Sequence, residues 1–248
     1  MNLTRWNDAI AIVTGASSGI GDAVVRRLAA GGLRVVATAR RKDRLEALAA
    51  ELGEDRVRVV PADLRSEADI RRVFAAADAW GDARVLVNNA GLGRYAPLTC
   101  GDTEAWREML EVNVLALCIA TREMVSRLRE RGGPGHVFHI SSMAAHRVPS
   151  ESGVYSATKF AVRSLTEGLR MELRAMKSPV RVTAISPGYV RTEFAENYHG
   201  DAAKAEATYS QYDVLTADDV ASAVEYALAL PPHAQIHDIL MRPTEQPS

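Results

Sequence analysis

Cysteine, net charge and long apolar runs are all scarce in this sequence. Only Cys100 and Cys118 occur among 248 residues, which is too few for a disulfide framework and predicts a reducing, cytoplasmic setting. The formal net charge is -1, so no basic footprint indicates a nucleic acid or an anionic membrane as a partner. The apolar run from Val114 to Ala120 is far shorter than the ~18 residues of a membrane span, and residues 1–8 lack a signal-peptide core.

Linkers, low-complexity tracts and long repeats are missing as well. Apolar residues make up 47% of the chain and charged residues 25%, which is ordinary globular usage and excludes a disordered or fibrous class. A chain of this length is compatible with one sheet-centred domain. We therefore expect a single domain that spans residues 1–248.

Short apolar runs alternate with stretches of helical periodicity along the whole chain. This alternation predicts an α/β fold with a doubly wound, seven-stranded parallel sheet (a Rossmann fold) and helices on both faces. The expected strands are 9–14, 33–38, 57–60, 84–87, 136–140, 180–185 and 238–241. The expected helices are 20–30, 43–52, 66–80, 106–131, 153–176 and 216–230.

The stretch from about 187 to 215 has no clear periodicity. Irregular segments of this length inside a compact domain are usually lids or binding loops. We therefore expect it to form a substrate lid.

A glycine-rich turn follows the first expected strand and opens the first helix. Its glycines are spaced G-x-x-x-G-x-G, which meets the needs of a tight turn, close phosphate approach and close helix packing. The turn predicts a pyrophosphate site made by Gly15, Ser17, Ser18, Gly19, Ile20 and Gly21.

A basic cluster stands about twenty residues past these glycines, where an NAD site would carry an acidic residue. The sequence there is Ala39-Arg40-Arg41-Lys42. A guanidinium is a planar fork suited to a phosphate, so Arg40, with Arg41 or Lys42 adding charge, predicts NADP as the cofactor. A solvated basic loop is the plainer alternative.

Tyr155 and Lys159 stand four residues apart in a segment expected to be helical. That spacing places an ammonium beside a phenol on one helix face. A neighbouring cation lowers the pKa of a phenol, so Tyr155 would be able to exchange a proton near neutral pH. By itself the pair is also typical of a solvated helix surface.

Together these motifs resemble the short-chain dehydrogenase/reductase family. The resemblance rests on the glycine pattern, 88–91 (Asn-Asn-Ala-Gly), Asn113, Ser142, the Tyr155 and Lys159 pair, and Pro187-Gly188. It implies that Tyr155 donates the proton, that Lys159 lowers its pKa, that Ser142 binds the substrate oxygen, and that Asn113, on a locally distorted helix, anchors a water relay. Ser141 is the alternative to Ser142.

The resemblance also implies further cofactor contacts. Asp63 and Leu64 would hold the adenine, and the remaining contacts would come from Asn89, Ala90, Gly91, Pro187, Gly188, Val190 and Thr192. Segments 113–117, 121–123, 146–148 and 241–246 resemble one NADP-dependent branch of the family, whose members act on apolar or dicarbonyl compounds or on small hydroxy acids.

These motifs predict an NADP(H)-dependent oxidoreductase that interconverts a carbonyl and its alcohol. Candidates for the substrate pocket are Arg94, His146, Arg147, Tyr189, Phe194 and Tyr198. A 3-hydroxy acid dehydrogenase is the alternative if Arg94 or Arg147 faces a substrate carboxylate; a non-catalytic NADPH sensor is a further one. Family members assemble through their long helices, which implies a homotetramer, or a homodimer.

A metal site is not expected. His136 and His139 are three residues apart on an expected strand, and an odd separation sends their side chains to opposite faces.

Overall fold

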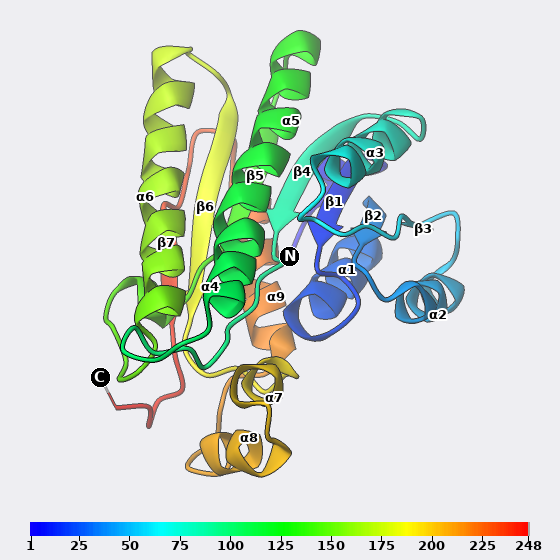
Figure 1. Cartoon of the computed structure of the whole chain (residues 1–248). Helices are drawn as coiled ribbons and strands as arrows, with labels where there is room; N and C mark the ends of the chain where they lie inside the picture. Colours follow the sequence, from blue (N-terminus) through cyan, green and yellow to red (C-terminus); the bar gives the residue numbers. More distant parts are fainter. Residues whose placement is uncertain (248) are drawn as a thin grey trace.

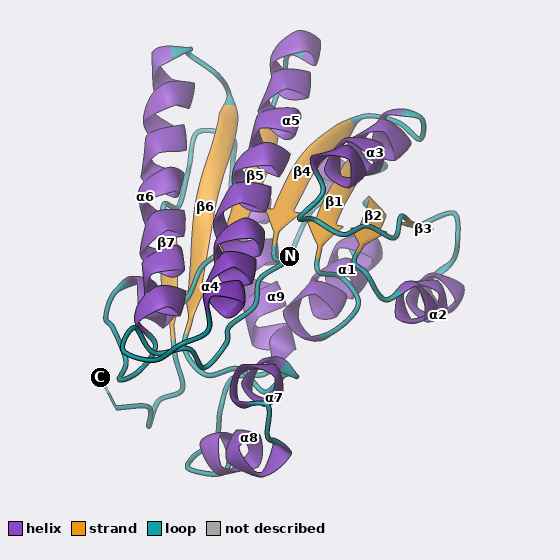
Figure 2. Cartoon of the chain, in the orientation of Figure 1, coloured by secondary structure: helices purple, strands orange, loops and turns teal. Residues whose placement is uncertain are grey.

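A seven-stranded parallel sheet forms the centre of the computed structural model, which describes residues 1–247 (Figures 1 and 2). The strands lie in the order β3-β2-β1-β4-β5-β6-β7. Their bounds are β1 Ile10–Thr14, β2 Arg34–Thr38, β3 Val57–Val59, β4 Ala83–Asn88, β5 Gly135–Ile140, β6 Val180–Pro187 and β7 Asp238–Met241. The expected parallel Rossmann sheet is confirmed.

Helices cover both faces of this sheet, as expected. One face carries α1 (Gly19–Ala30), α2 (Lys42–Leu52) and α9 (Ala217–Ala229), and the other carries α3 (Glu67–Asp78), α5 (Ala116–Arg131) and α6 (Gly153–Ala175). Successive residues of β1 alternate between the two cores: Ala11 and Val13 face α1, whereas Ile10 and Ile12 face α3. No helix within residues 1–247 is both long and apolar enough to cross a membrane.

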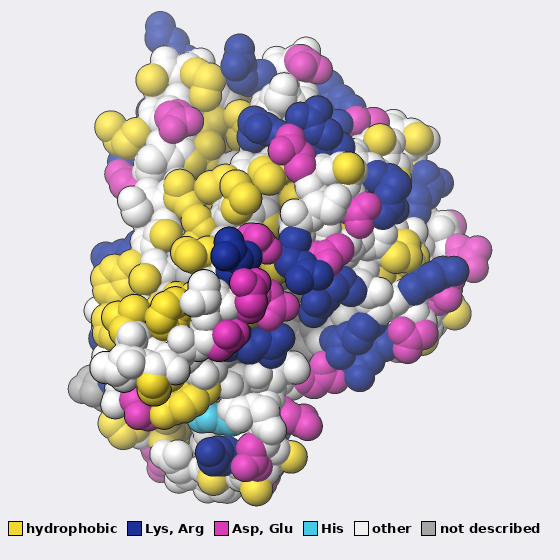
Figure 3. All heavy atoms as spheres, in the orientation of Figure 1, with side chains coloured by type: hydrophobic (Ala, Val, Ile, Leu, Met, Phe, Trp, Pro, Cys, Tyr) yellow, Lys and Arg dark blue, Asp and Glu magenta, His cyan; other side chains and the backbone are white. Residues whose placement is uncertain are grey.

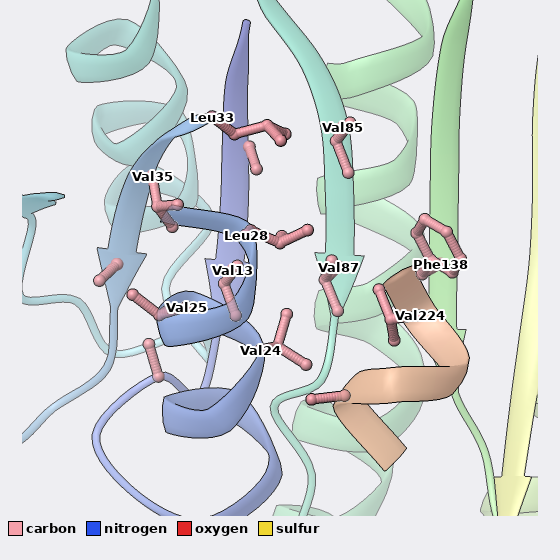
Figure 4. Packing of buried hydrophobic residues seen from close by; sticks show 14 of the residues in the cluster. Val13, Val24, Val25, Leu28, Leu33, Val35, Val85, Val87, Phe138 and Val224 are labelled. Carbon is pink, nitrogen blue, oxygen red and sulfur yellow. The ribbon is translucent and has the colours of Figure 1, made fainter. Parts of the chain in front are cut away.

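The core between α1 and the sheet is made almost entirely of branched aliphatic side chains. In Figure 4, Val24, Val25 and Leu28 of α1 point toward residues of β1, β2 and β4, while Val224 of α9 lies beside Phe138 of β5. Such close packing fixes the first turn of α1 against the end of β1. The glycine-rich turn between them is therefore held by buried residues on both sides.

The chain reverses its direction of winding between β1 and β4. In a doubly wound sheet, ligands bind in the crevice outside the carboxyl ends of the strands at such a reversal. The loops after β1, β4, β5 and β6 all end at this edge, and the helices α7 (Phe194–His199) and α8 (Ala202–Tyr209) lie beyond it (Figure 1).

The 187–215 segment is more regular than its sequence indicates. We expected an irregular stretch, but it contains α7 and α8, whose short lengths hide their periodicity. Asp201 caps α8 by accepting hydrogen bonds from the amides of Ala203 and Lys204 at 2.8 and 3.3 Å. Hydrogen bonds of Leu215 with Tyr189 and Arg191 close the base of the segment.

The expected long helix 106–131 is interrupted. It consists of α4 (Thr103–Leu110), a π-helical turn η2 (Glu111–Leu115) and α5. Two 3-10 turns that the pattern did not predict are η1 (Thr4–Trp6) and η3 (Met143–Ala145). The π turn matters for the site because it carries Asn113.

His139 of β5 joins α5 and α6 through a buried hydrogen-bond chain. Its Nε2 lies 3.2 Å from Thr121 Oγ1 and its Nδ1 lies 2.8 Å from Thr166 Oγ1. Because Thr166 donates to the carbonyl of Val162, it accepts from Nδ1–H, and burial lowers the pKa of His139 to about 3. His139 is therefore a neutral structural residue, and His136 on the other face bonds Thr183 instead.

Candidate active site

Three glycines of the turn after β1 are required by contact, and two of them, Gly15 and Gly19, also by their positive φ. Gly15 has a φ of 66°, and a Cβ there would lie 2.9 Å from the Cα of Ala90. At Gly21 a Cβ would lie 2.3 Å from the carbonyl oxygen of Gly15, and at Gly19 it would lie 3.0 Å from Thr192. The turn is thus packed against the loops after β4 and β6 and has no room for side chains.

The first turn of α1 keeps its amides free of a side-chain cap. Ser18 occupies the cap position, but its hydroxyl accepts from Arg41 at 2.6 Å rather than from the helix amides. These amides and the positive end of the helix dipole suit an anionic group. The predicted residues Ser17, Gly19, Ile20 and Gly21 lie in the same turn, so the structure fits the pyrophosphate of a dinucleotide.

The Asn-Asn-Ala-Gly loop after β4 is fastened to the end of β1. Asn89 donates through Nδ2 to the carbonyl of Thr14 at 2.8 Å. The hydroxyl of Thr14 accepts from the amides of Asn89 and Ala90 at 3.0 and 2.9 Å. The two loops that border the crevice are therefore one hydrogen-bonded unit.

The two arginines after β2 behave differently. Arg40 is exposed, with its guanidinium 3.8 Å from Glu108. Arg41 reaches back over the glycine-rich turn and donates to Ser17 at 3.1 Å and to Ser18 at 2.6 Å. Both arginines thus lie at the rim of the proposed dinucleotide site, and Arg41 makes the closer contacts with the turn.

Asp63 and Leu64 stand at the end of the loop after β3. The carboxylate of Asp63 is engaged by Arg65, whose hydrogen bonds lower the pKa of Asp63. The amide of Asp63 donates to Asp69 at 2.8 Å. Leu64 packs against the core beside α3. The loop is therefore fixed from both sides.

Tyr155 and Lys159 lie on one face of α6, as their spacing indicates. The Nζ of Lys159 is 5.8 Å from the centre of the Tyr155 ring and donates to the carbonyl of Ile140 at 3.0 Å. Burial lowers the pKa of Lys159 to about 8. The expected lowering of the Tyr155 pKa is wrong for this structure: burial raises that pKa, against the opposing effect of a hydrogen bond with Ser142.

Ser142 and Ser141 point in different directions at the end of β5. The hydroxyl of Ser142 lies close enough to Tyr155 to oppose the rise of its pKa. It also accepts a hydrogen bond from the amide of Ala144 at 3.1 Å, which starts η3. Ser141 is 3% exposed, and its hydroxyl has no hydrogen-bond partner among residues 1–247. The geometry thus pairs Ser142, and not Ser141, with the phenol.

The π turn directs the side chain of Asn113 into the centre of the fold. Its amide group pairs with the backbone of Leu92 in both directions at 2.8 Å and donates to Thr158 at 3.0 Å. Thr158 in turn donates to the carbonyl of Tyr155 at 2.7 Å. Asn113 therefore joins the loop after β4 to the helix that carries Tyr155, and π turns often occur at functional sites.

Residues after β6 form the other wall of the crevice. Gly188 donates its amide to Met241 at 2.7 Å, and Tyr189 donates its amide to the side chain of Gln246 at 3.0 Å. A Cβ at Gly188 would lie 2.2 Å from Gln246 Oε1. Pro187 ends β6, and Val190 and Thr192 follow Gly188 in the same loop. Met241 and Gln246 therefore fix this loop from behind.

Aromatic side chains of α7 cover Tyr155. The ring centres of Phe194 and Tyr198 lie 5.4 and 6.3 Å from that of Tyr155. Tyr95, which the sequence did not single out, makes an edge contact with Tyr198 at 6.5 Å. At Gly93 a Cβ would lie 2.7 Å from both α7 rings. The predicted pocket residues Phe194 and Tyr198 are therefore beside the phenol.

The three charged pocket candidates are not brought together. Arg94 donates through Nε and Nη2 to the same oxygen of Glu108 at 3.1 and 3.0 Å, and it lines a polar hollow of about 400 Å³ near α4. The Nε2 of His146 lies 3.0 Å from Asp238 on β7. Arg147 has a buried Nε without a hydrogen-bond partner among residues 1–247. Arg94 is thus already paired. Arg147 keeps a buried unpaired Nε, and the Nε2 of His146, although near Asp238, also makes no hydrogen bond among residues 1–247.

Several residues of the site gave no local sequence signal. They are Tyr95, Thr158, Glu193 and Gln246, each of which contacts a loop or helix end that is distant in sequence. Tyr95 was accessible in principle, because loops at the carboxyl ends of parallel strands meet at one edge. The other three depend on side-chain packing.

Known proteins resemble this chain in sequence and in fold. A family model described as short chain dehydrogenase matches residues 9–203. Dehydrogenase/reductase SDR family member 11 of Bos taurus is 49% identical over 253 residues, which cover 98% of this chain and 99% of the relative. Farnesol dehydrogenase of Aedes aegypti is 39% identical over 248 residues, with 97% and 98% covered. The closed form of serine dehydrogenase complexed with NADP+ superimposes with a TM-score of 0.91 at 37% identity, covering 96% of each chain.

Proposed function

Because the chain belongs to the short-chain dehydrogenase/reductase family, and is thus an oxidoreductase acting on CH-OH groups, we propose a specific reaction for it. It interconverts a ketone, aldehyde or dicarbonyl and the corresponding alcohol, with NADP(H) as the cofactor and Tyr155 as the acid and base. A purely NADPH-binding sensor is disfavoured by the enzymes among its relatives and by the intact set of Asn113, Ser142, Tyr155 and Lys159.

The observation that carries this proposal is the convergence of four polar side chains at one edge of the sheet. A Cβ placed on Gly91 would lie 3.4 Å from Asn113 Oδ1 and 3.5 Å from Lys159 Nζ. Ser142 lies near the phenol of Tyr155, whose pKa it lowers against the effect of burial. Four residues from three separate parts of the chain, namely η2, the loop after β5 and α6, thus converge beside the glycine-rich turn.

The residues along this crevice fit NADP. We propose that the glycine-rich turn holds the pyrophosphate, that Arg40 and Arg41 hold the 2′-phosphate, and that Asp63 and Leu64 hold the adenine. The nicotinamide end would contact Asn89, Ala90, Gly91, Tyr155, Lys159, Pro187, Gly188, Val190 and Thr192. When bound, the nicotinamide supplies or accepts the hydride.

The chain's own residues handle the proton. A phenol with a raised pKa keeps its proton at neutral pH, so Tyr155 is able to donate it to a carbonyl oxygen. Ser142 hydrogen-bonds the same oxygen and favours the charge that develops on it. Lys159 has a pKa of about 8 and can return a proton to Tyr155, with Asn113 anchoring the relay between them and solvent.

We propose that the 187–215 segment is the substrate lid and that the substrate is mainly apolar. Phe194 and Tyr198 present aromatic rings to Tyr155, and Tyr189 stands at the base of the segment. Farnesol dehydrogenase, an enzyme named for an isoprenoid alcohol, is among the relatives of this chain. Tyr209 is buried and hydrogen-bonded within the segment, so it supports the lid and does not face substrate.

A 3-hydroxy acid substrate is the second candidate, and one observation favours it. Arg147 follows His146 after η3 and retains a buried, unpaired Nε that could meet a carboxylate. The similar solved structure named serine dehydrogenase acts, by its name, on a compound of this kind. Arg94 gives this alternative no support because Glu108 already neutralises it.

A substrate panel tests the proposal. Purified protein is assayed with NADPH and NADH against neutral ketones, aldehydes and dicarbonyls, and in the reverse direction with farnesol-like alcohols and 3-hydroxy acids. Turnover of neutral carbonyls with NADPH supports the main reading, and exclusive turnover of 3-hydroxy acids supports the alternative. Tyr155→Phe should lower kcat by a factor on the order of 10² to 10⁴ while NADPH affinity is retained. Full activity of that variant would refute Tyr155 as the proton donor.

We also propose a homotetramer, with a homodimer as the alternative. Apolar side chains gather on the face of the molecule that carries α5 and α6 (Figure 3). Exposed members on η2 and α6 include Leu115, Phe160 and Met171, at 54%, 39% and 57% exposure. Analytical ultracentrifugation measures the assembly. A cytoplasmic location remains part of the proposal because both cysteines are free thiols.

A further inference from the structure

Glu193 links the lid to the arginines that follow β2. Its carboxylate lies 2.7 Å from Arg41 and 2.5 Å from Arg44, and its side chain is 38% exposed. Hydrogen bonds from Arg44 and Arg41 lower the pKa of Glu193 to about 2, so the carboxylate is charged at any pH where the protein is handled. The start of α7 is thereby fastened to the start of α2.

Arg41 also donates hydrogen bonds to the glycine-rich turn. Arg41 directs Nε to the hydroxyl of Ser17 and Nη2 to that of Ser18. A hydroxyl that accepts from Arg41 keeps its own proton available, so both serines remain able to donate to an anion. The positive charge of Arg41 and Arg44, in contrast, is already half compensated, because the single carboxylate of Glu193 faces both guanidinium groups.

We propose that Glu193 determines cofactor selectivity by competing with the 2′-phosphate of NADPH for Arg41, which the proposed function places at that phosphate, and for the neighbouring Arg44. This inference rests on the proposed use of NADP. A 2′-phosphate carries a charge of roughly -1.5 to -2 at neutral pH and takes the two arginines from a single carboxylate. NADH has a hydroxyl at this position, so it leaves the pairing of Glu193 intact. The carboxylate therefore weakens NADPH binding and leaves NADH binding unchanged.

Glu193→Gln tests the competition, with Glu196→Gln as its matched control. Glu196 lies on the exposed side of the same helix, so its variant removes the same charge away from the arginines. The dissociation constants of NADPH and NADH are measured by fluorescence titration at fixed, low ionic strength. We expect Glu193→Gln to tighten NADPH binding by about three- to tenfold and to leave NADH unchanged, whereas Glu196→Gln changes neither by that amount.

A small probe isolates the phosphate site from the rest of the cofactor. Adenosine 2′-monophosphate should bind Glu193→Gln more tightly than wild type, and adenosine 5′-monophosphate should not. With both Arg41→Gln and Arg44→Gln in place, the effect of Glu193→Gln should disappear because the carboxylate then has no arginine to neutralise.

The two binding titrations distinguish a failure of the role proposed for Glu193 from a failure of the proposed use of NADP. If wild type prefers NADPH and Glu193→Gln leaves or weakens that affinity, this inference is overturned and the cofactor assignment stands. If neither wild type nor Glu193→Gln prefers NADPH over NADH, the cofactor assignment itself fails, and the role of Glu193 fails with it.

Discussion

The titration of Lys159 is a measurable consequence of the geometry around Tyr155. Lys159 is 5% exposed, and burial lowers its pKa from 10.5 to about 8. This difference corresponds to roughly 3 kcal/mol of lost solvation for the ammonium, since one pH unit is about 1.4 kcal/mol. At pH 7 the side chain is still about nine-tenths protonated, so it enters the reaction as a cation.

The lowered pKa also predicts how stability depends on pH. Between pH 8 and 10.5 the unfolded chain binds more protons at this lysine than the folded chain does, so the free energy of unfolding rises with pH across that window. This favourable contribution of Lys159 to the free energy of unfolding is fully present above about pH 10.5 and is lost as the pH falls through about 8. Lys159→Met should remove this dependence, and it should unfold at a higher temperature than wild type at pH 7 while turnover is abolished.

The measurement is simple because the chain has only four lysines. Lysine labelled with carbon-13 at Cε gives four signals, and Lys159→Arg identifies the one that disappears. Lys42, Lys177 and Lys204 are not buried and serve as internal references. A Lys159 signal that titrates near the ordinary lysine value of about 10.4 would refute the burial argument.

Two further substitutions examine the cofactor crevice. Arg40→Asp should lower the preference for NADPH over NADH by roughly tenfold or more in binding titrations. The substitution replaces a cation that donates hydrogen bonds to the 2′-phosphate with an anion that repels it. An unchanged ratio would exclude Arg40 from the 2′-phosphate site. Gly21→Ala places a Cβ 2.3 Å from the carbonyl oxygen of Gly15. It should weaken NADPH binding at least tenfold and destabilise the fold by about 1–3 kcal/mol. The control Gly168→Ala, whose Cβ would have nothing within 4 Å, should leave NADPH binding unchanged.

Much of the fold was accessible from the sequence because its signals are local. Each strand is an apolar run, as in Ala9 to Thr14, and each long helix has a buried stripe, so the parallel sheet and its two covered faces could be predicted. The glycine-rich turn could be read for the same reason. Its glycine spacing shows the turn itself, whereas the contacts of Gly15 with Ala90 and of Gly19 with Thr192 join loops that are distant in sequence.

What the sequence could not provide is the pairing of distant side chains. Arg94 and Arg41 look alike as loop arginines, yet one is neutralised by Glu108 and the other joins Ser17, Ser18 and Glu193. The raised pKa of Tyr155 likewise depends on burial, which a Tyr-x-x-x-Lys spacing does not report. The helices α7 and α8 were missed because six and eight residues are too few to show a period.

The position of β1 in the sheet also has a consequence for how the chain is made. Its inner neighbour β4 is paired through contacts such as Ile12 with Leu86, a separation of about 70 residues, so one edge of β1 has no native partner until β4 has left the ribosome. An apolar strand with an open edge is a template for wrong pairing. We therefore expect nascent chains that end before β4 to need chaperone protection. Full-length chains no longer need it once β4 has paired with β1.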